Sequence, residues 1–178
     1  MPMGVIAAAY LVECTKDNIV VRVIRTCINT LAGVPSIVFG LFGATFFMQW
    51  FLPRFGLEPK PSILAGALTL AVLVLPVVIR ASEEAIRSVP QTYKEASLSL
   101  GAGSLRTFLL VTFPAALPGI LTGGILSLSR AAGETAAVLF CCAVASGDAP
   151  NSIFDPTMIL SYSSYVFATG DRLAARAP

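Results

Sequence analysis

Residues 61–79 read PSILAGALTLAVLVLPVVI and carry no Asp, Glu, Lys or Arg. An α-helix rises 1.5 Å per residue, so a helix that crosses a membrane needs about 20 mainly apolar residues. Two further uncharged stretches of this kind occur at 26–53 and 107–129. Because three such runs lie in one short chain, we expect an all-α membrane helix bundle rather than a soluble domain with apolar core helices.

The composition agrees with a surface that faces lipid. Only 12% of the 178 residues are charged and 56% are hydrophobic, whereas a soluble domain carries about 25% charged residues. The net charge of +2 gives no sign of nucleic-acid binding. The sequence contains no histidine, which excludes Ser–His and Cys–His catalysis and removes the commonest metal ligand. We therefore expect no metal site and no cofactor.

The four cysteines, Cys14, Cys27, Cys141 and Cys142, form no Cys-x-x-Cys pair. We interpret them as small apolar packing residues.

We predict three full spans, at 28–52, 62–79 and 118–145. The third is placed from Pro118 because proline is best tolerated in the first turn of a helix. Arg130 then falls near the middle of the bilayer. Residues 1–12 are also uncharged but too short to span, and we interpret them as the end of a partial span whose start is missing.

Basic residues in short loops indicate which side of the membrane each loop occupies. They are concentrated before the first span and between the second and third. The outer loop 53–60 balances two basic residues with Glu58. We therefore expect 13–25 and 80–106 in the cytoplasm, and 53–60 and the tail from 146 outside. The cytoplasmic basic residues are Lys16, Arg22, Arg25, Arg80, Arg87, Lys94 and Arg106.

The cytoplasmic loop 81–113 contains the signals of a short helix. Thr92-x-x-Glu95 fits a capping box, and Gly101 fits a helix C-cap. The predicted helix covers 93–100, with Tyr93, Ala96 and Leu100 along one stripe. From the pattern alone it is either an ordinary interfacial helix or a plug for the groove of a partner.

The same loop resembles a family signature. Permeases of binding-protein-dependent ABC importers have Glu-Ala-Ala, three residues, Gly, nine residues, then Ile-x-Leu-Pro. This chain has Glu95-Ala96-Ser97, three residues, Gly101, nine residues, then Val111-Thr112-Phe113-Pro114. Ser97, Val111 and Phe113 are mild departures. The resemblance implies a coupling helix that docks in a groove of an ATPase subunit, with Glu95, Ala96 and Gly101 at the docking positions.

Three other segments resemble the phosphate branch of this family. They are NTLAGVPSIVFG at 29–40, LPVVIRASEEA at 75–85 and SRAAGETA at 129–136. The likeness covers most of the chain, to about 152–168, and is nearer to the A-type than to the C-type of the two paired permeases. It implies one permease domain over 1–178, part of an ATP-driven phosphate importer in the bacterial inner membrane. Another oxyanion such as sulfate or molybdate, or a non-functional permease fragment, is the alternative.

Arg130 and Glu134 are the candidate residues of the substrate path. An arginine near the midplane costs at least about 2.5–3.5 kcal/mol on insertion scales, and two residues four apart on a helix can pair. The pair is either internal and structural, or it exchanges partners so that Arg130 meets a phosphate oxyanion. The guanidinium group suits phosphate geometry.

No Gly-x-x-x-x-Gly-Lys-Ser/Thr phosphate loop is present, so ATP hydrolysis is expected on a separate subunit and the chain itself is not an enzyme. The resemblance implies three partners: an ATPase dimer, a second permease subunit and an extracytoplasmic phosphate-binding protein. Permeases of this branch resemble six-span proteins, so we expect a chain truncated at both ends.

Overall fold

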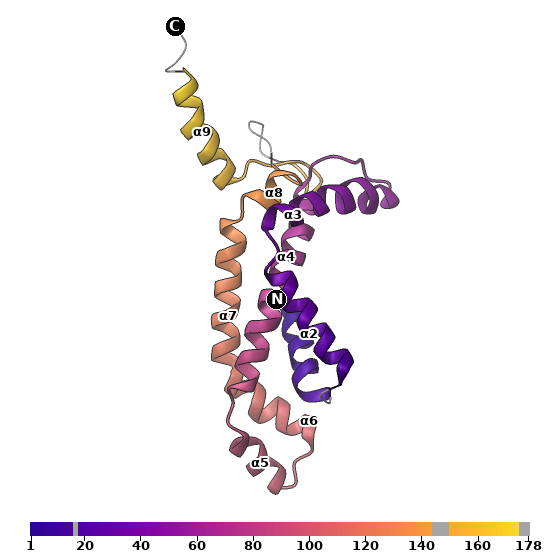
Figure 1. The fold of residues 1–178 in the computed structure, drawn as a ribbon, viewed down its shortest axis with the longest axis vertical. Helices are drawn as coiled ribbons and strands as arrows, with labels where there is room; N and C mark the ends of the chain where they lie inside the picture. The colour runs from indigo at the N-terminus through magenta and orange to yellow at the C-terminus, as the bar shows by residue number, and fades with distance from the viewer. Residues whose placement is uncertain (16–17, 144–149, 175–178) are drawn as a thin grey trace. The chain divides into compact units, whose positions relative to one another are not determined.

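The computed structural model describes residues 1–15, 18–143 and 150–174. Within these ranges the chain forms helices joined by turns and loops, and no strand is present (Figure 1). An isolated bridge between Ala143 and Thr157 is the nearest approach to a sheet in these ranges. The predicted all-α fold is confirmed.

Three helical stretches are long and apolar enough to cross a membrane, as predicted. Ser36–Phe55 contains α3 (Ser36–Phe42), the π-helical η2 (Gly43–Phe51) and the 3₁₀ turn η3 (Leu52–Phe55). Ile63–Arg87 is the single helix α4. Ser104–Gly133 contains α6 (Ser104–Thr107), the π-helical η4 (Phe108–Thr112) and α7 (Phe113–Gly133).

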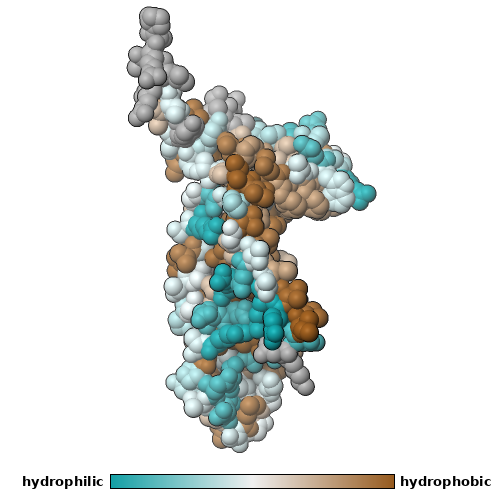
Figure 2. Space-filling model, in the orientation of Figure 1, coloured by the Kyte–Doolittle hydropathy of each residue, from teal (hydrophilic) through white to brown (hydrophobic). Residues whose placement is uncertain are grey.

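A shorter apolar helix precedes them, as the pattern of residues 1–12 predicted. Pro2–Cys14 contains α1 (Pro2–Ala9) and the π-helical η1 (Tyr10–Cys14). Figure 2 shows hydrophobic residues over large parts of the surface that faces the viewer. Many large apolar side chains are exposed, which fits a surface that meets lipid or further helices rather than water.

The predicted limits of the first two spans are wrong. The first was placed at 28–52, but α2 (Ile19–Ala32) ends before Gly33 and a new helix begins at Ser36. Proline disfavours the helical conformation of the residue before it, so Pro35 separates the two helices. The second was placed at 62–79, but α4 continues to Arg87. Charged residues end an apolar run without ending the helix.

The predicted third span, 118–145, is shifted in the structure to Ser104–Gly133. Pro118 lies inside α7 rather than at its start, because neighbouring helices and local π-turns can accommodate proline in membrane helices. At the other end the chain leaves the helix after Gly133 and forms only the four-residue α8 (Ala136–Leu139). The predicted end near residue 145, and the start of the outer tail at 146, lie outside the described residues.

One compact unit consists of Met1–Gly33 and Val74–Arg130. Its core gathers apolar residues from α1, η1, α2, α4, the turn after α4 and α7: Ala8, Leu11, Val21, Ile79, Ala85, Ile86, Val89, Ala116 and Ile120. Glycines bring α7 against α4. A Cβ added to Gly119 would lie 2.8 Å from the Cβ of Ala85, and one on Gly123 would lie 2.5 Å from that of Ala81. The Gly-x-x-x-Gly spacing therefore marks a close helix contact.

The second compact unit consists of Val34–Leu73 and Ala131–Pro178, and its described residues include α3, η2, η3, α8 and α9 (Leu160–Ala174). Glycine again permits close packing, since a Cβ on Gly43 would lie 2.1 Å from Thr69 Oγ1 and 2.8 Å from Cys141 Sγ. Cys141 and Cys142 are buried packing residues, as predicted, and burial raises the pKa of both thiols. Cys14 and Cys27 are exposed, so that interpretation is wrong for them.

A row of aromatic rings lies along the first span, from its middle toward its C-terminal end. Phe42, Phe46 and Trp50 stack in sequence with 5.1 Å between successive ring centroids, and Arg54 lies over the Trp50 ring at 5.1 Å. Tryptophan and arginine side chains with apolar stems favour the boundary between lipid and water. This end of the span therefore has the composition of a membrane interface, next to the loop predicted to lie outside.

The contact between α4 and α7 makes a stability prediction. Gly123→Ala places a methyl group against Ala81 and should destabilise the protein by about 1–3 kcal/mol, the range for overpacking a closely packed contact. The measurement is thermal unfolding of the purified protein in detergent. Gly133→Ala, at the open end of α7 where nothing lies near an added Cβ, is the matched control. Equal unfolding temperatures for the two variants would contradict the contact.

Candidate functional site

Arg130 lies in the last turn of α7 and lines a cavity of about 310 Å³. The cavity is also lined by Arg80 and Ala81 of α4, by Val77 one turn earlier on the same helix, and by Ala32 at the end of α2. The glycine contact between α7 and α4 carries α7 along the face of α4 that holds these residues. Two arginines, 50 positions apart in the sequence, thus line one small cavity.

The place of this cavity along α4 can be judged from its lining. Val77 lies two residues before the end of the uncharged run 61–79, and Arg80 begins the segment expected in the cytoplasm. Arg130 is close to the end of its own helix, where the partial negative charge of the helix C-terminus favours a cation. That Arg130 lies near the bilayer midplane stays a prediction.

Glu134 lies one residue beyond the end of α7, which is at Gly133, in the turn before α8. The prediction of one continuous helix through both residues is therefore wrong, and their pairing stays a prediction. That Arg130 and Glu134 both act on a substrate stays a prediction.

A second cavity, of about 230 Å³, contains a charge network that the sequence analysis missed. It is lined by Arg25, Asn29, Arg80, Glu83, Glu84 and Arg87. Glu83 Oε1 forms ion pairs with two arginines, with Arg25 Nε at 2.8 Å and Arg87 Nη2 at 2.9 Å. The four-residue spacing of Glu83 and Arg87 is a signal for their pairing, whereas Arg25 lies on another helix and gives none.

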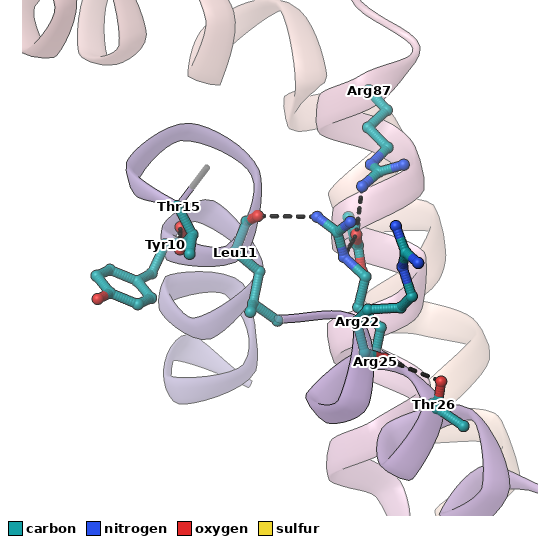
Figure 3. Close-up of polar contacts among 8 residues, drawn as sticks. Tyr10, Leu11, Thr15, Arg22, Arg25, Thr26 and Arg87 are labelled. Carbon is teal, nitrogen blue, oxygen red and sulfur yellow. Dashed lines mark hydrogen bonds and ion pairs between the residues drawn. The ribbon is translucent and has the colours of Figure 1, made fainter. Parts of the chain in front are cut away.

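Arg25 extends this network to η1. Its Nη2 donates to the carbonyl oxygen of Leu11 at 2.9 Å (Figure 3). The last carbonyls of a helix have no partner within that helix, so a cation there satisfies an exposed acceptor. Arg80 lines both cavities, which places a cation between the network and Arg130. Across the described ranges, no group of three or more His, Cys, Asp or Glu side chains could hold a metal ion.

The short helix of the loop is α5 (Gln91–Ser99), and the prediction of a helix there is confirmed. The capping box is wrong: the residue before the helix is Pro90, Thr92 lies inside the helix, and no side chain caps it. Pro90 with its fixed φ sets the start. Gly101 has φ +81, a left-handed conformation that ends a helix and suits glycine. The predicted C-cap is therefore confirmed.

No residue of α5 is buried. Glu95, Ala96 and Gly101, the positions predicted to dock, are all exposed. Leu100 is 90% exposed, which is unusual for a leucine without a partner. The other apolar side chains that α5 exposes are Tyr93 and Leu98.

Of the remaining motif positions, Ser97 is half-buried and Pro114 is exposed. The Ser97 hydroxyl lies 3.0 Å from the Thr107 hydroxyl of α6, and Pro114 lies in the first turn of α7. The motif therefore combines an exposed face with residues that fix α5 to the next span.

Comparison with known proteins gives consistent results. The family of binding-protein-dependent transport system inner membrane components matches residues 1–169. The chain is 45% identical over 140 residues to the probable ABC transporter permease protein YqgI of Bacillus subtilis, covering 79% of this chain and 46% of that protein. It is 43% identical over 139 residues to the phosphate transport system permease protein PstA 1 of Mycobacterium tuberculosis, covering 78% and 43%.

A third relative, the phosphate transport system permease protein PstA of Pasteurella multocida, is 35% identical over 139 residues, with 78% of this chain and 47% of that protein covered. These matches confirm the resemblance that the loop and span segments predicted. The chain spans less than half the length of these three relatives.

The C-cap of α5 makes a second prediction. Gly101→Ala forces a side chain into the left-handed region and costs about 1–2 kcal/mol, so α5 should fray. Faster amide hydrogen exchange over Gln91–Ser99 would report this. Gly103→Ala is the control, because Gly103 has φ −71 and open space around it. If both variants exchange alike, Gly101 does not hold the end of α5.

Proposed function

This chain belongs to the family of binding-protein-dependent transport system inner membrane components. We propose that it acts as a permease subunit of an ATP-driven phosphate importer. The chain is a multi-pass inner-membrane protein, with three helices long and apolar enough to span. Relatives at 43% and 35% identity carry the name phosphate transport system permease protein. These names and the arginine-lined cavity support phosphate as the substrate.

The observation that carries the proposal is α5. A nine-residue helix without a buried residue, placed between two spans, adds little to the packing of its own chain. Its exposed tyrosine and leucines fit a helix that is buried by a partner. We assign this partner as a separate ATPase subunit, present as a dimer, with Glu95, Ala96 and Gly101 at the contact. ATP hydrolysis then takes place on that subunit, and this chain is not an enzyme.

The cavity at Arg130 suits an oxyanion in transit. Two guanidinium groups offer several N–H donors to phosphate oxygens, and the apolar residues Ala32, Val77 and Ala81 complete the lining. Glu134, just beyond α7, supplies a carboxylate that can take the place of phosphate on Arg130 once the anion leaves. A transport site requires such an exchange, because a site that binds one partner permanently does not turn over.

The complete importer also needs components outside this chain. A second permease subunit and an extracytoplasmic phosphate-binding protein complete the proposed path. Sulfate and molybdate are the competing substrates, since they share the oxyanion chemistry that arginine recognises.

Arg130→Gln tests the substrate path. Removing the charge should reduce ATP-dependent phosphate uptake into vesicles about 100-fold, as loss of a charge-assisted contact of about 3 kcal/mol implies. The variant is assembled with the ATPase, second permease and binding protein, and assembly is checked by co-purification. Arg54→Gln, at the aromatic end of the first span, is the control. Normal uptake by Arg130→Gln would remove Arg130 from the path.

Ala96→Trp tests the coupling surface. A bulky side chain at the docking face should weaken binding of the ATPase subunit about tenfold or more, a loss of 1.4 kcal/mol or more. Gln91→Trp is the control on the same helix, because at 100° per residue it lies 140° away around the axis. The measurement is titration of the purified ATPase subunit onto the permease in nanodiscs. Equal affinities for the two variants would contradict docking through Ala96.

A further inference from the structure

The inner side of α5 carries an ion pair to a distant part of the chain. Lys94 Nζ contacts the carboxylate of Glu13 in η1, 81 positions earlier. The two side chains are only 17% and 20% exposed. A charge pair shielded in this way interacts more strongly than a surface pair, and removing one partner leaves the other in a poorly solvated place.

The segment that holds Glu13 is itself fixed to two other helices. Two residues before Glu13, the carbonyl oxygen of Leu11 accepts from Arg25 of α2 at 2.9 Å. Arg25 also binds Glu83 of α4 at 2.8 Å, and Glu83 binds Arg87 at 2.9 Å. Two ion pairs and one hydrogen bond to a backbone carbonyl, joined through the backbone of η1 between Leu11 and Glu13, therefore connect α5 to α2 and α4.

A second contact between α5 and another helix is local. Ser97 and Thr107 lie 3.0 Å apart and only ten positions apart in the sequence, so they join α5 to the start of the next helix. This neutral hydrogen bond fixes the angle between adjacent elements. The Lys94–Glu13 pair instead joins α5 to the opposite end of the unit's sequence, where η1 leads into α2.

We propose that Glu13 is a positioning residue for coupling: its ion pair with Lys94 makes η1 follow the movement of α5, and Arg25 passes that movement to α2 and α4. This inference rests on the proposed function, because only a docked ATPase would move α5. Glu13 touches neither the proposed substrate nor ATP. Glu13 instead affects the coupling step, in which ATP hydrolysis in the partner displaces the helices that border both arginine cavities.

The same contacts could also act as a static brace, so the test must separate coupling from stability. In the assembled importer in proteoliposomes, phosphate uptake and ATP hydrolysis are measured together, giving phosphate moved per ATP hydrolysed. Glu13→Lys and Lys94→Glu are compared with the double reversal. The control reversals are Glu58→Lys and Lys60→Glu, in an exposed pair whose charged atoms are 3.8 Å apart.

The expected result is a fall of about threefold or more in this ratio for each single reversal at Glu13 or Lys94, within the range of coupling changes caused by residues between two sites. The double reversal should restore the ratio, and the control pair should leave it unchanged. Unchanged ratios in assembled single variants would overturn the inference while the proposed function stands.

Glu13→Gln keeps the side-chain shape and covers the case in which a reversal does not assemble. Its ratio should fall as well, and an unchanged ratio would again overturn the inference. The wild-type importer separates the two levels of the account. If it hydrolyses ATP without moving phosphate or another oxyanion, the proposed function fails, and the role of Glu13 in coupling fails with it.

Discussion

The structure depends first on the requirement that backbone N–H and C=O groups be hydrogen-bonded within hydrocarbon. Only helices meet this within one segment, so the apolar parts of the chain form Ser36–Phe55, Ile63–Arg87 and Ser104–Gly133. Side chains add little attraction between helices in lipid, since lipid is as apolar as leucine. Close packing therefore falls to small residues, and Gly119 and Gly123 let α7 contact α4 at backbone distance. That contact brings the arginine of one helix to the cavity bordered by the other.

Charge is arranged around this apolar frame in two different ways. Arg80 and Arg130 line a small cavity together with apolar residues, and we propose that an oxyanion in transit binds there. Arg25, Glu83 and Arg87 instead satisfy one another and the end of η1. Arg80 borders both groups. We propose that the first arrangement serves a transported anion, whereas the second holds helices together. The second arrangement is also connected, through η1, to the exposed helix α5.

The sequence was sufficient to predict the spans but not their limits. Uncharged runs locate hydrocarbon-compatible segments, yet they cannot show that α4 continues through Arg80 and Glu83 to Arg87. Local sequence signals predicted the helix α5 and its end at Gly101. The predicted capping box at Thr92 was wrong, because Pro90 is the N-cap and the helix begins at the next residue, Gln91. The cavity shared by Arg80 and Arg130, and the Lys94–Glu13 pair, depend on packing between segments far apart in the sequence. No local pattern encodes them.

The central claim is that this chain forms the phosphate path of an ATP-driven importer. The most direct measurement is uptake of radiolabelled phosphate into proteoliposomes that contain the complete importer with this chain in its permease, with sulfate and molybdate as competitors. The account predicts uptake that requires ATP and that excess unlabelled phosphate suppresses while the other two oxyanions do not. Uptake of sulfate or molybdate in place of phosphate, or none of the three, would contradict it.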